Sequence, residues 1–151
     1  MDQSSGQPLV AETLARMDAG WSAFRSRVHA MPSQLLEVRL GQGSWTRKQM
    51  LAHIGTWHDR TVEALGLLTD TGELPGGPEE TDVINARSAR AAVGRTAGEV
   101  LFALDDSYRL VRRAVSRLTD DRLLAHDSWA SAMIAGNTYG HYEEHLADLP
   151  G

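Results

Sequence analysis

Residues 9–31, LVAETLARMDAGWSAFRSRVHAM, decide the fold class. Their apolar side chains recur at alternating intervals of four and three residues, which is the repeat of one face of an α-helix. This apolar face consists of Val10, Leu14, Met17, Trp21, Phe24, Val28 and Met31. Pro32 cannot donate the backbone hydrogen bond that a helix interior requires, so we expect the helix to end there.

Two further long segments carry the same repeat. A second helix is expected to begin near Thr46, whose hydroxyl can accept a hydrogen bond from a free backbone N–H at the helix start. Its apolar face consists of Met50, Ile54, Trp57, Thr61, Ala64 and Leu68. A third long helix should follow Thr96 and Glu99, which have the spacing of a capping box. Its apolar face consists of Leu101, Leu104, Tyr108, Val111, Val115 and Leu118.

The remaining segments complete a helical architecture. Residues 69–81 are rich in Gly, Pro and acidic side chains and predict a loop, and a short helix is expected from Asp82 to about Ala92. The polar stretch TDDRLLAHDSW (119–129) predicts a break before a last helix from about Ser131 to Leu149. The sequence therefore predicts an all-α four-helix bundle, with a short extra helix before the third long helix, as one domain over residues 1–151.

Composition excludes several classes of protein and site. The net charge is −5 and no basic run occurs, so we expect no nucleic-acid partner. The chain contains no cysteine, which excludes disulfides, a thiolate nucleophile and a cysteine zinc site. We find no signal segment and no apolar run of the ~20 residues that span a bilayer, so we expect a cytoplasmic protein without a membrane partner. Two-fold dimers are common among bundles of this size, which makes a homodimer a candidate state.

The segment GNTYGHYEEHL (136–146) carries the first candidate site. His141 and His145 are four residues apart, so a helix places both imidazoles on one face, within reach of a common metal ion. They belong to a polar stripe of Ile134, Thr138, His141, His145 and Asp148. The neighbouring apolar stripe of Ala135, Tyr139, Tyr142, Leu146 and Leu149 must face the core. From the spacing alone, the polar stripe faces either solvent or a pocket between helices.

A third metal ligand would have to come from another helix. His53 and His58 are the candidates, because both flank the apolar face of the second helix at Ile54. Periodicity does not choose between them.

Three segments together resemble a known family: GSWTRKQMLAHIGTWHDR (43–60), TDVINARSARA (81–91) and GNTYGHYEEHL (136–146). In their order and spacing they are similar to the ClbS/DfsB family within the DinB/YfiT-like superfamily of four-helix proteins. Many members of that superfamily bind a divalent metal, often zinc or nickel, through a pair of residues on the last helix and a His that follows a Trp by eight positions. Trp45 and His53 match the latter pattern, so the resemblance selects His53, with His141 and His145, as metal ligands.

The resemblance also implies a small-molecule substrate. ClbS/DfsB members protect against DNA-reactive natural products, which implies a hydrolase that opens or detoxifies a reactive electrophile, for self-resistance or as a tailoring step. Thiol-dependent relatives transfer or isomerise electrophiles. Because Lys48 is the only lysine, the composition is typical of GC-rich bacteria such as actinobacteria, so mycothiol is the candidate thiol. A protein that sequesters its ligand without catalysis is the third alternative.

A metal held by three imidazoles keeps an open position and lowers the pKa of bound water towards ~7. Glu144, Tyr139 and Tyr142 are then candidate catalytic residues, and a core or capping role is the alternative for each. The candidate substrate-binding residues are Trp45, Trp57, Asn85 and Asn137. Residues 124–136 form a shorter segment than the family pattern has, so we expect a small loop above the pocket.

Overall fold

The computed structural model describes residues 6–41, 45–77 and 79–150. Its long helices are α1 (Pro8–Ala30), α2 (Arg47–Thr71), α4 (Ala97–Ser116) and α5 (Asp120–Asn137). Its shorter elements are α3 (Thr81–Val93), α6 (Tyr139–His145) and the 3₁₀ turns η2 (Ser33–Glu37) and η3 (Leu146–Asp148). Across these described ranges the chain forms helices and a single isolated β-bridge, between Arg39 and Thr46, so the all-α prediction is confirmed.

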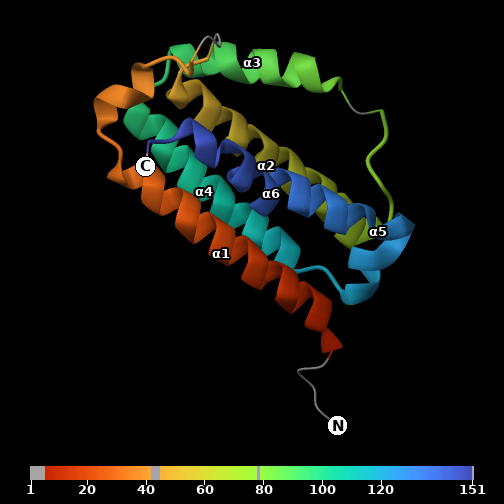
Figure 1. Ribbon diagram of the computed structural model, residues 1–151. Coiled ribbons are helices and arrows are strands. Elements are labelled where there is room, and N and C mark those ends of the chain that lie inside the picture. Colours follow the sequence, from red (N-terminus) through yellow and green to blue (C-terminus); the bar gives the residue numbers. More distant parts are fainter. Residues whose placement is uncertain (1–5, 42–44, 78, 151) are drawn as a thin grey trace.

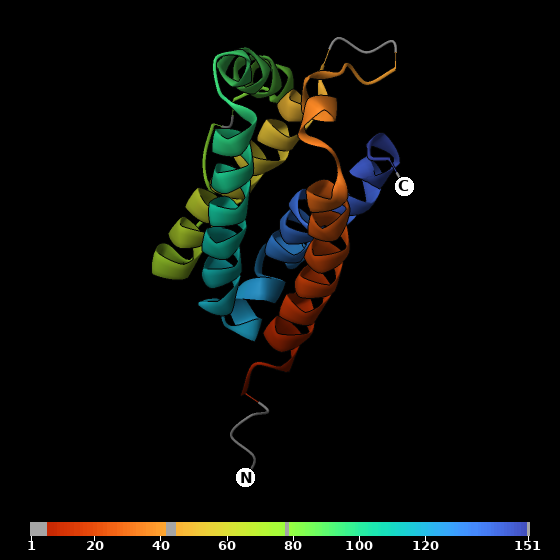
Figure 2. The same ribbon diagram turned by 90° about the vertical axis from the view of Figure 1, so that its left-hand side faces the viewer.

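The helices form a bundle with one helix across its end (Figures 1 and 2). α2 packs against α4, and α1 packs against α4, α5 and α6. α3 packs on α2 near the end of the bundle at which α2 begins. The predicted four-helix bundle with a short extra helix is therefore confirmed. No helix in the described part of the chain is both long and apolar enough to cross a membrane.

The core lies where the apolar faces of the helices meet. Met17 and Phe24 of α1, Ile54 of α2 and Val111 of α4 are all completely buried. Trp21 stacks on Tyr108 with ring centroids 4.5 Å apart, and this contact joins α1 to α4. The three apolar faces read from the sequence thus form one continuous core.

The helix starts show why the predicted boundaries are correct. Thr46 accepts a hydrogen bond from the backbone N–H of Gln49, whose side chain accepts one from the Thr46 N–H. Thr96 and Glu99 form the same reciprocal pair at the start of α4. Each pair satisfies two backbone groups that would otherwise lack partners, so both capping sites fix where the helices begin.

The predicted break at residues 119–129 is wrong in its extent. Thr119 caps α5 by accepting from the Arg122 N–H, so helix begins again at Asp120. Only Ala125 to Ser128 depart from helical geometry, and three of these residues have positive φ angles: His126, Asp127 and Ser128, at 55°, 56° and 61°. The small loop expected within residues 124–136 corresponds to these four residues, and the flanking polar residues of 120–124 are helical because polar side chains exposed on a helix look the same in sequence as a polar loop.

The predicted continuous helix from Ser131 to Leu149 is also wrong. Thr138 departs from helical geometry, with φ −124° and ψ −104°, and separates α5 from α6. The chain passes so close to itself here that a Cβ on Gly140 would lie 2.7 Å from the Ala135 carbonyl oxygen. α6 ends at His145 and is followed by η3. Periodicity missed this break because the four-and-three spacing is the same on both sides of it.

Candidate metal centre

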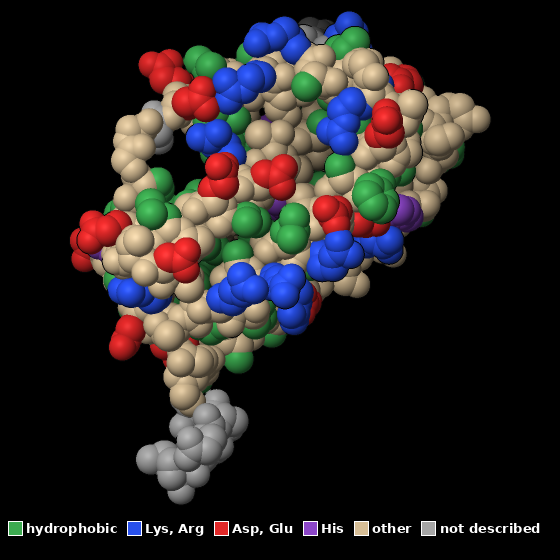
Figure 3. All heavy atoms as spheres, turned by 180° about the vertical axis from the view of Figure 1, so that it is seen from behind, with side chains coloured by type: hydrophobic (Ala, Val, Ile, Leu, Met, Phe, Trp, Pro, Cys, Tyr) green, Lys and Arg blue, Asp and Glu red, His purple; other side chains and the backbone are tan. Residues whose placement is uncertain are grey.

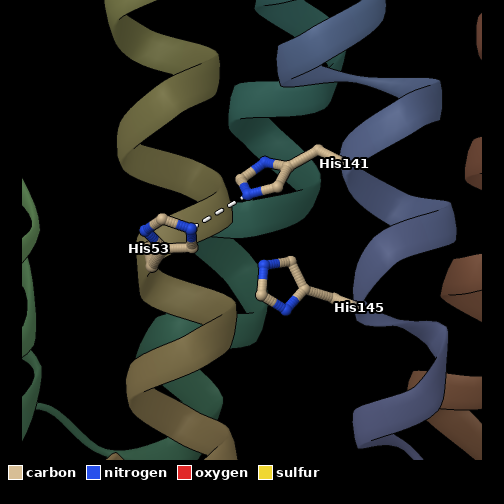
Figure 4. A group of neighbouring side chains, drawn as sticks. All are labelled: His53, His141 and His145. Atoms are coloured by element: carbon tan, nitrogen blue, oxygen red, sulfur yellow. Dashed lines mark hydrogen bonds between the residues drawn. The ribbon is translucent and has the colours of Figure 1, made fainter. Parts of the chain in front are cut away.

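Three imidazoles meet between α2 and α6 (Figure 4). His53 projects from α2, and His141 and His145 project from successive turns of α6. Their ligand nitrogens all lie within 4.8 Å of one another, and the Nε2 atoms of His53 and His141 are 2.9 Å apart. The structure thus brings His53 to the predicted His141 and His145 pair.

The orientation of His53 is fixed by Asn85 on α3. Asn85 Oδ1 accepts a hydrogen bond from the indole N–H of Trp57 at 2.8 Å, which identifies this atom as the oxygen. The same oxygen lies 3.1 Å from His53 Nδ1, so Nδ1 must carry the proton. His53 Nε2 consequently carries a lone pair directed towards the other two histidines, and in this arrangement it accepts a hydrogen bond from His141 Nε2 at 2.9 Å.

His145 is oriented in the same way by Asp148. Its Nδ1 donates to Asp148 Oδ2 at 2.8 Å, and its Nε2, which faces His53 and His141, is buried without a hydrogen-bond partner. A carboxylate behind an imidazole is the common support of a metal-ligating histidine. A buried lone pair without a partner is costly, so the donor set fits a cation at the point that the three Nε2 atoms face.

Burial keeps His53 and His141 in the neutral form, which is the form that can bind a metal. Burial, together with the nearby His145, lowers the pKa of His53 to about 4. Burial in the first place, and then the neighbouring His53, His145 and His58, together lower the pKa of His141 to about 3. Only a neutral imidazole can offer a lone pair to a metal, and both rings are neutral at neutral pH. The His141 proton would move from Nε2 to Nδ1 when Nε2 binds the ion.

One side of the histidine cluster opens into a cavity of about 330 Å³. Its walls include His53 and His141, so a ligand in the cavity reaches the imidazoles directly. The other lining residues are Trp57, Thr81, Asn85, Gly136, Asn137 and Glu144. Three nitrogen ligands with access from a cavity are the arrangement of catalytic zinc sites, whereas structural sites are closed by a fourth protein ligand.

Most of the predicted substrate-binding residues lie in or beside this cavity. Trp57, Asn85 and Asn137 line it, and the Asn137 amide donates to Thr61 at 3.0 Å. Trp45 contacts the His53 ring, with centroids 5.1 Å apart, instead of lining the cavity. Glu144 is exposed and lines the cavity, with its Oε2 3.8 Å from His145 Nε2.

The two tyrosines predicted as catalytic lie elsewhere. Tyr142 is buried in the core, where its hydroxyl lies 2.6 Å from His58 Nε2, and burial raises its pKa. Tyr139 packs beside Gly20 on α1, with the guanidinium of Arg16 above its ring. Neither lines the cavity, because the apolar stripe that carries them faces the core and α1. The structure thus places both tyrosines in packing positions apart from the cavity at the histidines, as the alternative core role expects.

His58, the other candidate that periodicity offered, is a core residue. It lies between Ser107 on α4 and Tyr142 on α6, at 2.7 Å and 2.6 Å, and is completely buried. Sequence reasoning gave no role to Asp148, although its place three residues after His145 on the polar stripe was a usable signal.

Comparisons with known proteins agree with this fold. No curated protein matches the chain. An uncharacterised protein from Escherichia coli UTI89 has a crystal structure that is similar with a TM-score of 0.77 and 17% sequence identity, over 92% of this chain and 89% of that chain. At this identity the likeness concerns the fold. Residues 16–148 match the DinB superfamily, and the chain therefore belongs to the DinB superfamily.

Proposed function

We propose that the protein is a metal-dependent hydrolase of a reactive, electrophilic small molecule. The observation that carries the proposal is the cluster of His53, His141 and His145, whose ligand nitrogens lie within 4.8 Å of one another beside a cavity. Three neutral nitrogen donors with an accessible side suit zinc or nickel. The resemblance to the ClbS/DfsB family supports a natural product as the electrophile and self-resistance or tailoring as the role.

The chain's own residues have separable tasks in such a reaction. Asn85 and Asp148 hold the His53 and His145 rings so that their Nε2 atoms converge. A divalent cation at that point would supply Lewis acidity and lower the pKa of water towards ~7. Glu144, at the cavity, would accept the proton that water loses as its oxygen attacks the electrophilic carbon. The electrons of the broken bond go to the leaving atom, which then takes up a proton.

Metal analysis of protein purified without chelator tests the metal centre. We expect about one zinc or nickel ion per chain, as in single three-histidine sites. His141→Ala and His145→Ala should lose the ion while the helical circular dichroism persists. His29→Ala is the matched control, because His29 is an exposed histidine on α1. A wild-type protein without metal would overturn the metal centre.

The products of a model reaction test the chemistry. The substrate would be an activated cyclopropane or an epoxide, offered with and without mycothiol. Hydrolysis adds the mass of one water to the product over many turnovers and requires no thiol. A thiol adduct formed only with mycothiol would instead support the transferase or isomerase alternative. Stoichiometric capture of the electrophile without turnover would support the sequestration alternative.

A further inference from the structure

A second and larger cavity adjoins the histidine cluster. It measures about 690 Å³ and lies between α2, the start of α3, α5 and residues 75–77 and 79–80. Trp57 and Thr81 line both this cavity and the smaller one at the histidines, so the two cavities are adjacent. Figure 3 shows the surface hollowed on the side where Figure 1 draws the segment before α3. This volume is that of a typical small-molecule site.

The walls of the larger cavity are mainly apolar and aromatic. Trp57 on α2 and Trp129 on α5 line it together with Met133 and Ile84. The hydrogen bond from Trp57 to Asn85 fixes the Trp57 ring. Two indoles and a flexible thioether suit a flat aromatic ligand, because aromatic pairs and sulfur–aromatic contacts are both favourable.

The backbone before Trp129 is strained in a way that is typical of ligand sites. His126, Asp127 and Ser128 all adopt left-handed φ angles, which is costly for residues with a Cβ. The His126 ring lies 2.9 Å from the Gly72 carbonyl oxygen and so holds this turn against the end of α2. The turn directly precedes the α5 segment that brings Trp129 and Met133 to the cavity wall.

The charged residues of the larger cavity disfavour an anion. Arg60 is paired with Glu79 at 3.4 Å, and Glu79 is also paired with Arg87 at 2.9 Å. Glu63 and Glu80 line the same cavity, and neither has an ion-pair partner among the described residues. The lining therefore carries an excess of negative charge, which repels carboxylates and sulfonates but accepts neutral or cationic ligands.

We infer that the larger cavity binds the uncharged or cationic aromatic body of the substrate and leaves its reactive end at the histidine cluster. The placement of the reactive end rests on the proposed function. Binding of the aromatic body does not, because Trp129, Met133, Glu63 and Glu80 are separate from the histidines. The same charges disfavour an anionic ligand body.

Two fluorescent probes test this inference. N-phenyl-1-naphthylamine and 8-anilino-1-naphthalenesulfonate share their aromatic rings, and only the second carries a sulfonate. We expect the neutral probe to bind with a stoichiometry of about one per chain, to quench tryptophan fluorescence, and to bind about tenfold more tightly than the sulfonate. Equal binding of both probes, or no binding of the neutral probe, would overturn the inference.

Variants locate the bound probe. Met133→Arg places a long charged side chain at the cavity wall and should weaken binding of the neutral probe about tenfold. Trp129→Ala removes one aromatic wall and gives a second reading if Met133→Arg fails to fold. Phe102→Arg is the matched control, because Phe102 is exposed on α4, and it should bind as wild type does. An equal loss in the control, or unchanged binding in both cavity variants, would contradict the assignment.

The charge requirement has its own variant. Glu63→Gln combined with Glu80→Gln should bring binding of the sulfonate closer to that of the neutral probe, and an unchanged preference would contradict the charge argument. Metal content is measured on the same samples. If the wild-type protein holds metal but does not bind the neutral probe, the inference about the larger cavity is refuted and the proposed function is not. If it binds the probe but holds no metal, the proposed function is refuted and the binding of an aromatic body is not.

Discussion

At the scale of single residues, the histidine cluster depends on side chains that hydrogen-bond to the imidazoles and are not themselves the expected metal ligands. Asn85 was predicted to bind substrate and does line the cavity, but its side-chain oxygen is shared by His53 and Trp57. The sequence could not show this second contact, because Asn85 lies on a different helix from both partners. Its role in positioning His53 follows from the two hydrogen bonds that Asn85 Oδ1 accepts, one from His53 and one from Trp57.

Replacing Asn85 should weaken metal binding without removing a ligand. Asn85→Leu deprives His53 Nδ1 of its acceptor, so the ring loses its fixed tautomer and orientation. Loss of such a supporting group typically costs 10–100-fold in metal affinity, and we expect about that loss here. Asn137→Leu is the matched control, because the Asn137 amide bonds to Thr61 instead of a histidine. Zinc affinity measured by competition with a chromophoric chelator checks this, and equal affinities in wild type and Asn85→Leu would contradict it.

The buried histidines should make the metal-free protein sensitive to acid. Burial lowers the pKa of His58 from 6.5 to about 3, so the folded state keeps this ring neutral while the unfolded chain protonates it. As the pH falls from 6.5 the unfolded state therefore binds more protons, and stability present above pH 6.5 is progressively lost down to about pH 3. From the size of this shift, His58 alone should cost about 3 kcal/mol between pH 6.5 and about pH 4.

His58→Gln isolates that contribution. Glutamine can still hydrogen-bond to Ser107 and Tyr142 but does not titrate. The free energy of unfolding of the variant should therefore fall less steeply with decreasing pH than that of wild type. Urea unfolding of both proteins with chelator present, at several pH values, provides the measurement. Parallel pH profiles would show that His58 does not titrate on unfolding.

At the scale of elements, the break between α5 and α6 sets the direction of the histidine pair. Sequence periodicity correctly placed His141 and His145 on one face, because both lie on α6. It predicted one straight helix because apolar spacing records which face is buried and carries no signal for a change of axis. The same apolar stripe was the better guide to Tyr139 and Tyr142, which pack against α1 and the core as residues on that stripe should.

Adding a methyl group at this break should destabilise the fold. In Gly140→Ala the new Cβ would lie 2.7 Å from the Ala135 carbonyl oxygen, so the backbone must shift, at a cost of about 1–3 kcal/mol. Gly136→Ala is the matched control, because its Cβ would meet nothing within 4 Å. In that control alanine should be neutral or stabilise the helix by up to ~1 kcal/mol. Urea unfolding compares the two, and equal stabilities would show that the close approach at Gly140 is easily relieved.

At the scale of the whole molecule, the sequence predicted the bundle better than it predicted the candidate site. The apolar faces of three helices are long and regular, and each becomes part of the core. Periodicity could not choose between His53 and His58, because both flank Ile54 and both are buried in the structure. What separates them is the neighbour each meets across the bundle: α6 histidines for one, and Ser107 and Tyr142 for the other.

A bound cation should tie distant parts of this bundle together and stabilise the whole fold. His53 and His141 are 88 positions apart in sequence, so the unfolded chain has no preformed site and binds metal weakly. Zinc at a free concentration of 100 times its dissociation constant should therefore raise the free energy of unfolding by about 2.7 kcal/mol. His53→Ala should abolish this gain, because it removes the α2 ligand and leaves only the α6 pair. His29→Ala should keep it. Thermal unfolding at increasing zinc concentrations measures this gain in stability. A wild-type melting temperature that does not change with zinc concentration would contradict a cation shared by α2 and α6.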